Sequence, residues 1–386
     1  MLQIMDRERE QTLLPLWRMP FRPMFLGAAV WGGIALCIWL AQLRGISLPA
    51  LRGGVIWHAH EMLFGFAGAV VVGFITTAMQ TWTGLRAPTG RALAGLSALW
   101  LAARLGYLFA GVPLWLPVMF ESGFFLVAAV LTGRRILAVR QWRNLFVIPA
   151  LIAFAALAAA HWLLPAWQRA GGLVTLLLVT GLITVFGGRV IPFFTARRFQ
   201  MQQRDKIVVL EIGSHIGVLA LLLAVGFNLP QPVWGWLALL LAVLQLARCG
   251  LWRPSLIWRE PLLWSLHVSY WFIVLGFFMA FLAWTGIARG LESGALHAFA
   301  VGGIGGMILA MISRVTLGHT GRMLKCPRLM PLAFAALALA ALARIFWAPA
   351  SNGLMVAVCG WLLGYGLYLY YYAPMLMAPR TDGQPG

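Results

Sequence analysis

The sequence predicts an all-α, polytopic membrane protein with about twelve transmembrane helices. Hydrophobic residues make up 62% of the 386-residue chain, charged residues only 10%, and the mean hydropathy is +0.86, far from the composition of a soluble domain. Apolar runs of about 20 residues, the length that crosses a bilayer as a helix, recur from one end to the other. These runs do not alternate in polarity, as the strands of a membrane β-barrel would.

The apolar runs define the expected helices and the domain limits. Twelve segments are expected, at residues 24–42, 60–82, 91–110, 114–131, 145–163, 172–190, 207–227, 233–251, 262–284, 295–317, 330–346 and 354–372. The connections are too short for a soluble domain. We therefore expect a cytoplasmic segment at 1–22, a single twelve-helix domain at 23–375 and a cytoplasmic tail at 376–386.

The chain has a net charge of +19, and the positions of its Lys and Arg residues predict how the protein is oriented in the membrane. Most Lys and Arg residues fall before the first helix, after even-numbered helices or in the tail, which places both termini in the cytoplasm of a bacterial inner membrane. This placement argues against a nucleic-acid partner and favours membrane lipid. The first 20 residues lack the apolar core and cleavage site of a signal peptide, so the first helix is expected to remain as an anchor. Four scattered cysteines predict no disulfide framework.

Polar residues inside the predicted helices fall into two layers, and such residues usually face a cavity, a cofactor or one another. The outer layer holds His58, His60 and Glu61 at the start of the second helix and His297 in the tenth. The inner layer consists of Arg189, Glu211, His215, His267, Arg314 and His319.

The stretch WHAHEMLFGF (residues 57–66) combines two histidines and a glutamate. On a regular helix His58 and Glu61, three apart, share a face, whereas His60 points elsewhere. If the helix begins only at Glu61, both histidines can converge on one ion. Imidazole suits haem iron, copper and zinc. The alternative is hydrogen bonding at the membrane interface.

Several other features have simpler interpretations. The glycines of HAFAVGGIGGM (residues 297–307) favour close helix packing, although they also leave space for a planar cofactor. Met307 and Met311 are expected to pack in the core rather than bind copper. His161, at the end of the fifth helix, has no obvious partner and is taken as structural.

Arg189 and Arg314 lie where helices are expected to leave the membrane on the inner side. An arginine at that depth needs a planar anionic partner. The candidates are Glu211, a phospholipid headgroup or a haem propionate. We expect Glu211 to pair with at least one of the two.

Four motifs together closely resemble the NnrS family of bacterial inner-membrane proteins. They are WHAHEMLFGFAGAVVVGFITTAMQTWTG, GGRVIPFFT, LHVSYW and LHAFAVGGIGGMILAMISRVTLGHTGR. The resemblance implies a haem- and copper-containing protein of nitric oxide metabolism and protection from nitrosative stress, with nitric oxide or a related molecule as ligand. It supplies neither a reaction nor a redox partner. The matching residues are His58, His60, Glu61, Trp82, Gly187, Gly188, Arg189, Pro192, Thr195, His267, His297, Arg314, Gly318 and His319.

Two cofactor sites follow as expectations. The chain has no CxxCH motif, so the haem should be b-type, held between the second and tenth helices by His297 with His58 or His60. A copper site is expected in the inner layer, at His267 and His319. His215 could join them, and its role stays open. Hydrogen bonding to helix ends and lipid headgroups is the alternative for these inner histidines.

The second, sixth and tenth helices each end at a Thr-bearing turn: TWTG, IPFFT and GHTG. Three quasi-repeats of four helices would resemble the catalytic subunits of haem–copper oxidases, although a shared fold would not establish a reaction. Two other functions stay open. One is a membrane oxidoreductase that reduces nitric oxide or transfers electrons. The other is a secondary transporter, which the scarcity of acids within the predicted helices disfavours.

Overall fold

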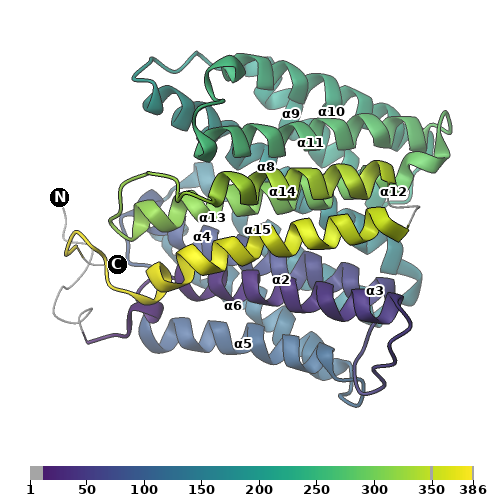
Figure 1. Cartoon of the computed structure of the whole chain (residues 1–386), viewed down its shortest axis with the longest axis horizontal. Helices are drawn as coiled ribbons and strands as arrows, with labels where there is room; N and C mark the ends of the chain where they lie inside the picture. The colour runs from purple at the N-terminus through teal and green to yellow at the C-terminus, as the bar shows by residue number, and fades with distance from the viewer. Residues whose placement is uncertain (1–11, 348–350, 385–386) are drawn as a thin grey trace. The chain divides into compact units, whose positions relative to one another are not determined.

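A computed structural model of the chain describes residues 12–347 and 351–384 as helices joined by short connections (Figure 1). Those two ranges contain no β-strand, which confirms the all-α prediction. Residues 1–11 of the expected N-terminal segment and residues 385–386 of the expected tail lie outside the described residues.

The helices have the lengths expected of a multi-pass membrane protein. Eleven helical stretches of the described residues are long and apolar enough to cross a bilayer. The twelfth long helix is α5, whose hydropathy is lowered by Arg91 and Arg104. The helices are α2 (Phe21–Leu43), α3 (Gly54–His60), η2 (Glu61–Ala67), α4 (Gly68–Thr83), α5 (Gly90–Leu108), α6 (Trp115–Ala138), α7 (Val147–Leu163), α8 (Gln168–Arg198), α9 (Val208–Gly226), α10 (Gln231–Leu251), α11 (Pro261–Trp284), α12 (Glu292–His297), η7 (Ala298–Gly305), α13 (Gly306–His319), α14 (Met330–Leu342), η8 (Ala343–Trp347) and α15 (Ser351–Met377).

The chain forms two compact units. The first comprises Met1–Gly172, Val315–Lys325 and Leu369–Gly386, and the second comprises Leu173–Arg314 and Cys326–Tyr368. In the first unit α6 packs against α4, α5 and α7, and α2 packs against α4 and η2. In the second unit α10 packs against α9 and α11, which Figure 1 shows side by side, and α11 also contacts η7 and α14. The domain limits expected at residues 23 and 375 stay a prediction.

The second membrane helix begins earlier than the sequence analysis expects. Its first residue is Gly54, which has a left-handed φ of +83°, a backbone conformation that favours glycine. His58 and His60 therefore both lie within α3, and the late start at Glu61, which would let them converge, does not occur.

Two π-helical segments directly follow candidate histidines. The segment η2 (Glu61–Ala67) begins after His60, and η7 (Ala298–Gly305) begins after His297. Long π-helical segments are rare and occur often at functional sites. The described residues contain a third such segment, η8, which has no histidine before it.

The glycines of η7 and α13 are used for close packing. A Cβ atom built on Gly302 would lie 2.2 Å from the Phe272 ring, and one on Gly305 would lie 2.5 Å from Trp361. These aromatic side chains occupy the space that the missing side chains leave, so the packing interpretation describes the glycines better than an open space for a cofactor.

Candidate functional site

His58 and His60 point to different surroundings, because residues two apart on a helix face in nearly opposite directions. The His58 ring stacks on the Trp39 indole, with centroids 4.2 Å apart and planes 17° apart. His60 is fully buried between two carboxylates. Its Nδ1 lies 2.9 Å from Glu61 Oε1 and its Nε2 lies 2.8 Å from Glu121 Oε2. Glu61 therefore acts with His60 rather than with His58, its expected partner.

Arg104 of α5 completes this group, which we call the His60 cluster (His60, Glu61, Arg104 and Glu121). Its Nη1 lies 2.6 Å from Glu61 Oε2, and its Nη2 pairs with Glu121. No member exposes more than 1% of its side chain. Carboxylate oxygens only accept hydrogen bonds, so a His60 ring protonated on both nitrogens fits this position. Two positive and two negative charges then cancel, which a buried site requires.

The protonated form of His60 has no lone pair for a metal ion. A metal would have to displace one carboxylate and leave it buried without its partner, which costs free energy. This arrangement makes His60 a poorer candidate ligand than the other histidines.

His161, for which no partner was expected, lies against the His60 cluster. The centroids of its ring and the His60 ring are 5.1 Å apart. Its Nε2 lies 3.3 Å from the Ile56 carbonyl oxygen, which can only accept, so Nε2–H is the donor. The Nδ1 atom is buried and has no hydrogen-bond partner.

A second buried arginine, Arg248 of α10, organises the polar interior of the other unit. Its Nε and Nη2 donate to the two carboxylate oxygens of Glu211, at 3.0 and 3.1 Å. Its Nη1 donates to Gln245 at 2.7 Å and to the Tyr270 hydroxyl at 2.9 Å. This fork geometry is the strongest that a carboxylate and a guanidinium can form.

Arg248 corrects the expected pairing of Glu211 with Arg189 or Arg314. The guanidinium of Arg314 instead lies over the Phe194 ring, 3.9 Å from its centroid, as a cation–π contact. Arg314 is 8% exposed, and no carboxylate of the described residues forms an ion pair with it. Arg189 is half-buried in α8. The expected pairing was based on the depth of each residue in the membrane. Depth alone does not identify ion-pair partners, because the rotation of each helix about its axis decides which side chains meet.

His267 is fully buried on α11, beside Thr195 of α8. The Thr195 hydroxyl donates to the Ile191 carbonyl at 2.9 Å and lies 3.1 Å from His267 Nε2. Since the hydroxyl proton is already used, we assign the proton of this second contact to His267 Nε2. The lone pair is then on Nδ1, which is buried and has no hydrogen-bond partner.

His297 shows the arrangement typical of a metal-binding imidazole. Its Nδ1 lies 2.7 Å from the backbone carbonyl oxygen of Ser293, one turn earlier in α12. The carbonyl accepts, so Nδ1 carries the proton and Nε2 the lone pair. Metal-ligating histidines usually donate their second ring nitrogen to such a carbonyl or carboxylate.

The remaining candidates lie apart from these groups. His215 is half-buried on α9, with an unpartnered Nε2. His319 ends α13, and its ring is 5.5 Å from the Phe21 ring. His319 belongs to the first unit and His267 to the second, so their joint copper site stays a prediction. In the described ranges, no three His, Cys, Asp or Glu side chains are grouped closely enough to hold a metal together.

The sequence analysis did not identify three charged residues of these groups. Glu121 and Arg104 are partners in the His60 cluster, and Arg248 is the partner of Glu211. A signal was present, because each is a charged residue inside an apolar run or at its end. Glu121 also weakens the argument against a transporter, which counted few acids within the membrane.

The family comparison covers almost the whole chain. The family model described as NnrS protein matches residues 15–380, a range that includes every candidate residue above. The search of curated proteins found no match. Membership suggests a membrane protein related to nitric oxide. The chain belongs to the NnrS family.

Proposed function

We propose that this protein binds b-type haem and copper in a bacterial inner membrane and acts in nitric oxide metabolism or protection from nitrosative stress. The observation that carries the proposal is His297, whose Nδ1 is committed to the Ser293 carbonyl 2.7 Å away. The lone pair on Nε2 suits an axial bond to haem iron. The π-helical segment that follows His297 supports a functional role for this position.

Haem iron would supply the binding site for nitric oxide. The residues of the chain would bind and orient the haem. His297 provides the axial nitrogen, and the Ser293 carbonyl holds its ring in one tautomer. Arg314 lies 17 residues after His297, about 25 Å further along one continuous helical stretch, so it suits the propionate of a haem only if that haem lies nearer the inner face and is not held by His297. His58 remains a second candidate ligand, and Trp39 fixes its ring plane.

Copper would bind the inner-layer histidines. His267 offers an unpartnered Nδ1 in a buried position, and a neutral imidazole of this kind suits copper. His215 offers a similar nitrogen in the same unit. The participation of His319 is part of the same proposal.

The haem assignment is tested by the absorption spectrum of the purified protein. We expect a Soret band that is lost or shifted in His297→Ala and partly restored by added imidazole. Ser293→Ala is the matched control, because it changes the same helix but keeps the carbonyl that accepts from His297. Unchanged haem content in His297→Ala, His58→Ala and His60→Ala, with normal expression, would refute the assignment. A wild-type protein without a Soret band would favour the transporter class.

The copper assignment is tested by elemental analysis. We expect copper to fall in His267→Ala while the Soret band is retained. Full copper occupancy in His267→Ala and in His319→Ala would contradict the inner-layer site. Steady-state turnover of nitric oxide with an added reductant would identify an oxidoreductase.

A further inference from the structure

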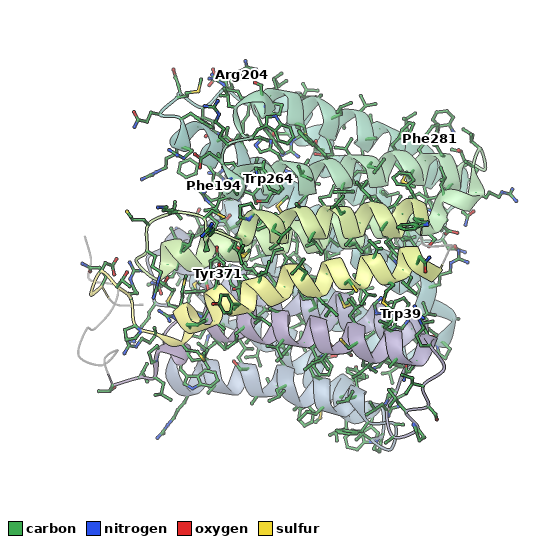
Figure 2. All side chains as sticks on the ribbon, in the orientation of Figure 1. Trp39, Phe194, Arg204, Trp264, Phe281 and Tyr371 are labelled. Atoms are coloured by element: carbon green, nitrogen blue, oxygen red, sulfur yellow. The ribbon has the colours of Figure 1, made fainter. Side chains whose placement is uncertain are left out.

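A pocket opens at one end of the second unit, where α8 and α10 end and α9 begins. Its volume is about 500 Å³, measured out to the open mouth. Its wall includes Thr195 and Trp252, together with the connection from α8 to α9. Figure 2 labels Arg204 on that connection. Thr195 also contacts His267, the proposed copper ligand, whereas the connection from α8 to α9 has no part in the proposed haem or copper sites.

The pocket wall is positively charged. Arg204, Lys206 and Arg253 line it, together with two acids, Asp205 and Glu211. The charge of Glu211 is already compensated by the two hydrogen bonds from Arg248. Apart from Glu211, the lining therefore holds three cations and one carboxylate, that of Asp205.

The start of α9 adds to this positive potential. The helix is 19 residues long, and no side chain caps its N-terminus. The first backbone N–H groups of a helix have no partner within the helix and favour a negative charge nearby. The pocket therefore suits an anionic group with several acceptor oxygens, such as a phosphate.

An apolar surface starts beside the pocket. Val208, Ile212 and Ile216 recur every four residues on one face of α9, and each is more than half exposed. Leu219 continues the same surface and is 56% exposed. Because α9 is a candidate membrane span, this face suits acyl chains.

We propose that the pocket binds the phosphodiester headgroup of an anionic phospholipid, whose acyl chains lie along α9. Basic pockets between membrane helices bind such headgroups. The apolar face of α9 distinguishes this ligand from free phosphate, which would gain nothing from it.

Native mass spectrometry of the detergent-purified full-length protein tests the proposal. The probes are dioleoyl phosphatidylglycerol and dioleoyl phosphatidylcholine. The variant is Arg204→Gln/Lys206→Gln/Arg253→Gln, and size-exclusion chromatography checks that it folds. Three cations near a headgroup predict roughly a hundredfold weaker phosphatidylglycerol binding. The matched control is Arg91→Gln/Arg134→Gln/Arg143→Gln, which removes three exposed cations of the other unit and should leave binding unchanged.

Two outcomes would overturn the pocket as a site for an anionic headgroup. One is equal binding of the two wild-type lipid complexes. The other is equal weakening in the pocket variant and the control, which would indicate only general attraction between charges.

A competition experiment distinguishes a phospholipid headgroup from free phosphate as the ligand. We expect dihexanoyl phosphatidylglycerol and inorganic phosphate to compete with the dioleoyl lipid much more weakly than unlabelled dioleoyl lipid does. Competition by inorganic phosphate at the same concentration as the lipid would assign the pocket to free phosphate and overturn the lipid proposal.

Discussion

Replacing Arg104 with glutamine should destabilise the first unit strongly. The guanidinium is fully buried, lies 2.6 Å from Glu61 and also pairs with Glu121. Without it, two carboxylates share a single positive partner, His60, in a site that water does not reach. Breaking a buried ion pair by removing one partner costs about 3–5 kcal/mol, so we expect a loss of that size in the free energy of unfolding.

A second substitution identifies the cause of that loss. Glu121→Gln in the Arg104→Gln background leaves Glu61 opposite His60 and restores charge balance. The double variant should therefore be more stable than the sum of the two single losses predicts. Groups in one ion-pair network show coupling energies of about 0.5–3 kcal/mol, whereas independent sites add.

The measurement is the unfolding of the purified protein in detergent micelles, followed by tryptophan fluorescence. Arg91→Gln is the matched control, because Arg91 lies on the same helix and is exposed. Its substitution should change stability by less than about 0.5 kcal/mol. If Arg104→Gln is no less stable than Arg91→Gln, the ion pairs of the His60 cluster do not stabilise the first unit.

Three further predictions concern Arg248, Cys326 and the C-terminal tail. Arg248→Gln should lower the unfolding temperature, Glu211→Gln should restore part of the loss, and Arg314→Gln, which removes no ion pair to Glu211, should show no such rescue. Burial raises the pKa of the Cys326 thiol from 9.0 to about 12, so its thiolate fraction at pH 8 is smaller than after denaturation, and iodoacetamide should label it at least about tenfold more slowly in the folded protein. A fluorescent protein fused to the C-terminus should fluoresce if the tail is cytoplasmic, and a fused alkaline phosphatase should stay inactive.

The fold could be predicted because a bilayer imposes a simple rule on sequence. A spanning helix needs about 20 apolar residues with few charges, and run length alone reveals it. The second membrane helix shows the limit of that rule. Its apolar run begins near His60, whereas the helix begins at Gly54, because turn geometry and not hydropathy determines the first residue.

The candidate site was harder to predict, because ion-pair partners come from other helices. His60 was identified as functional, but Glu121 lies 61 positions later, on α6. Local periodicity describes which residues share a face of one helix. It contains no information about which face of another helix will lie opposite. The π-helical segments after His60 and His297 were likewise invisible, since no composition signal marks them.

One buried arginine in each unit, Arg104 or Arg248, lies against a glycine of another helix. A Cβ atom on Gly65 would lie 2.6 Å from Arg104 Nη1, and one on Gly188 would lie 1.7 Å from Arg248 Nη2. Neither separation leaves room for a side chain. Because each glycine has no side chain, the guanidinium of a neighbouring helix can lie against its backbone. The guanidinium then reaches carboxylates inside the unit. In a sequence of this class, a glycine in a membrane helix therefore has a third interpretation beside helix packing and cofactor space: it can mark the place where a buried cation crosses to its counter-ion.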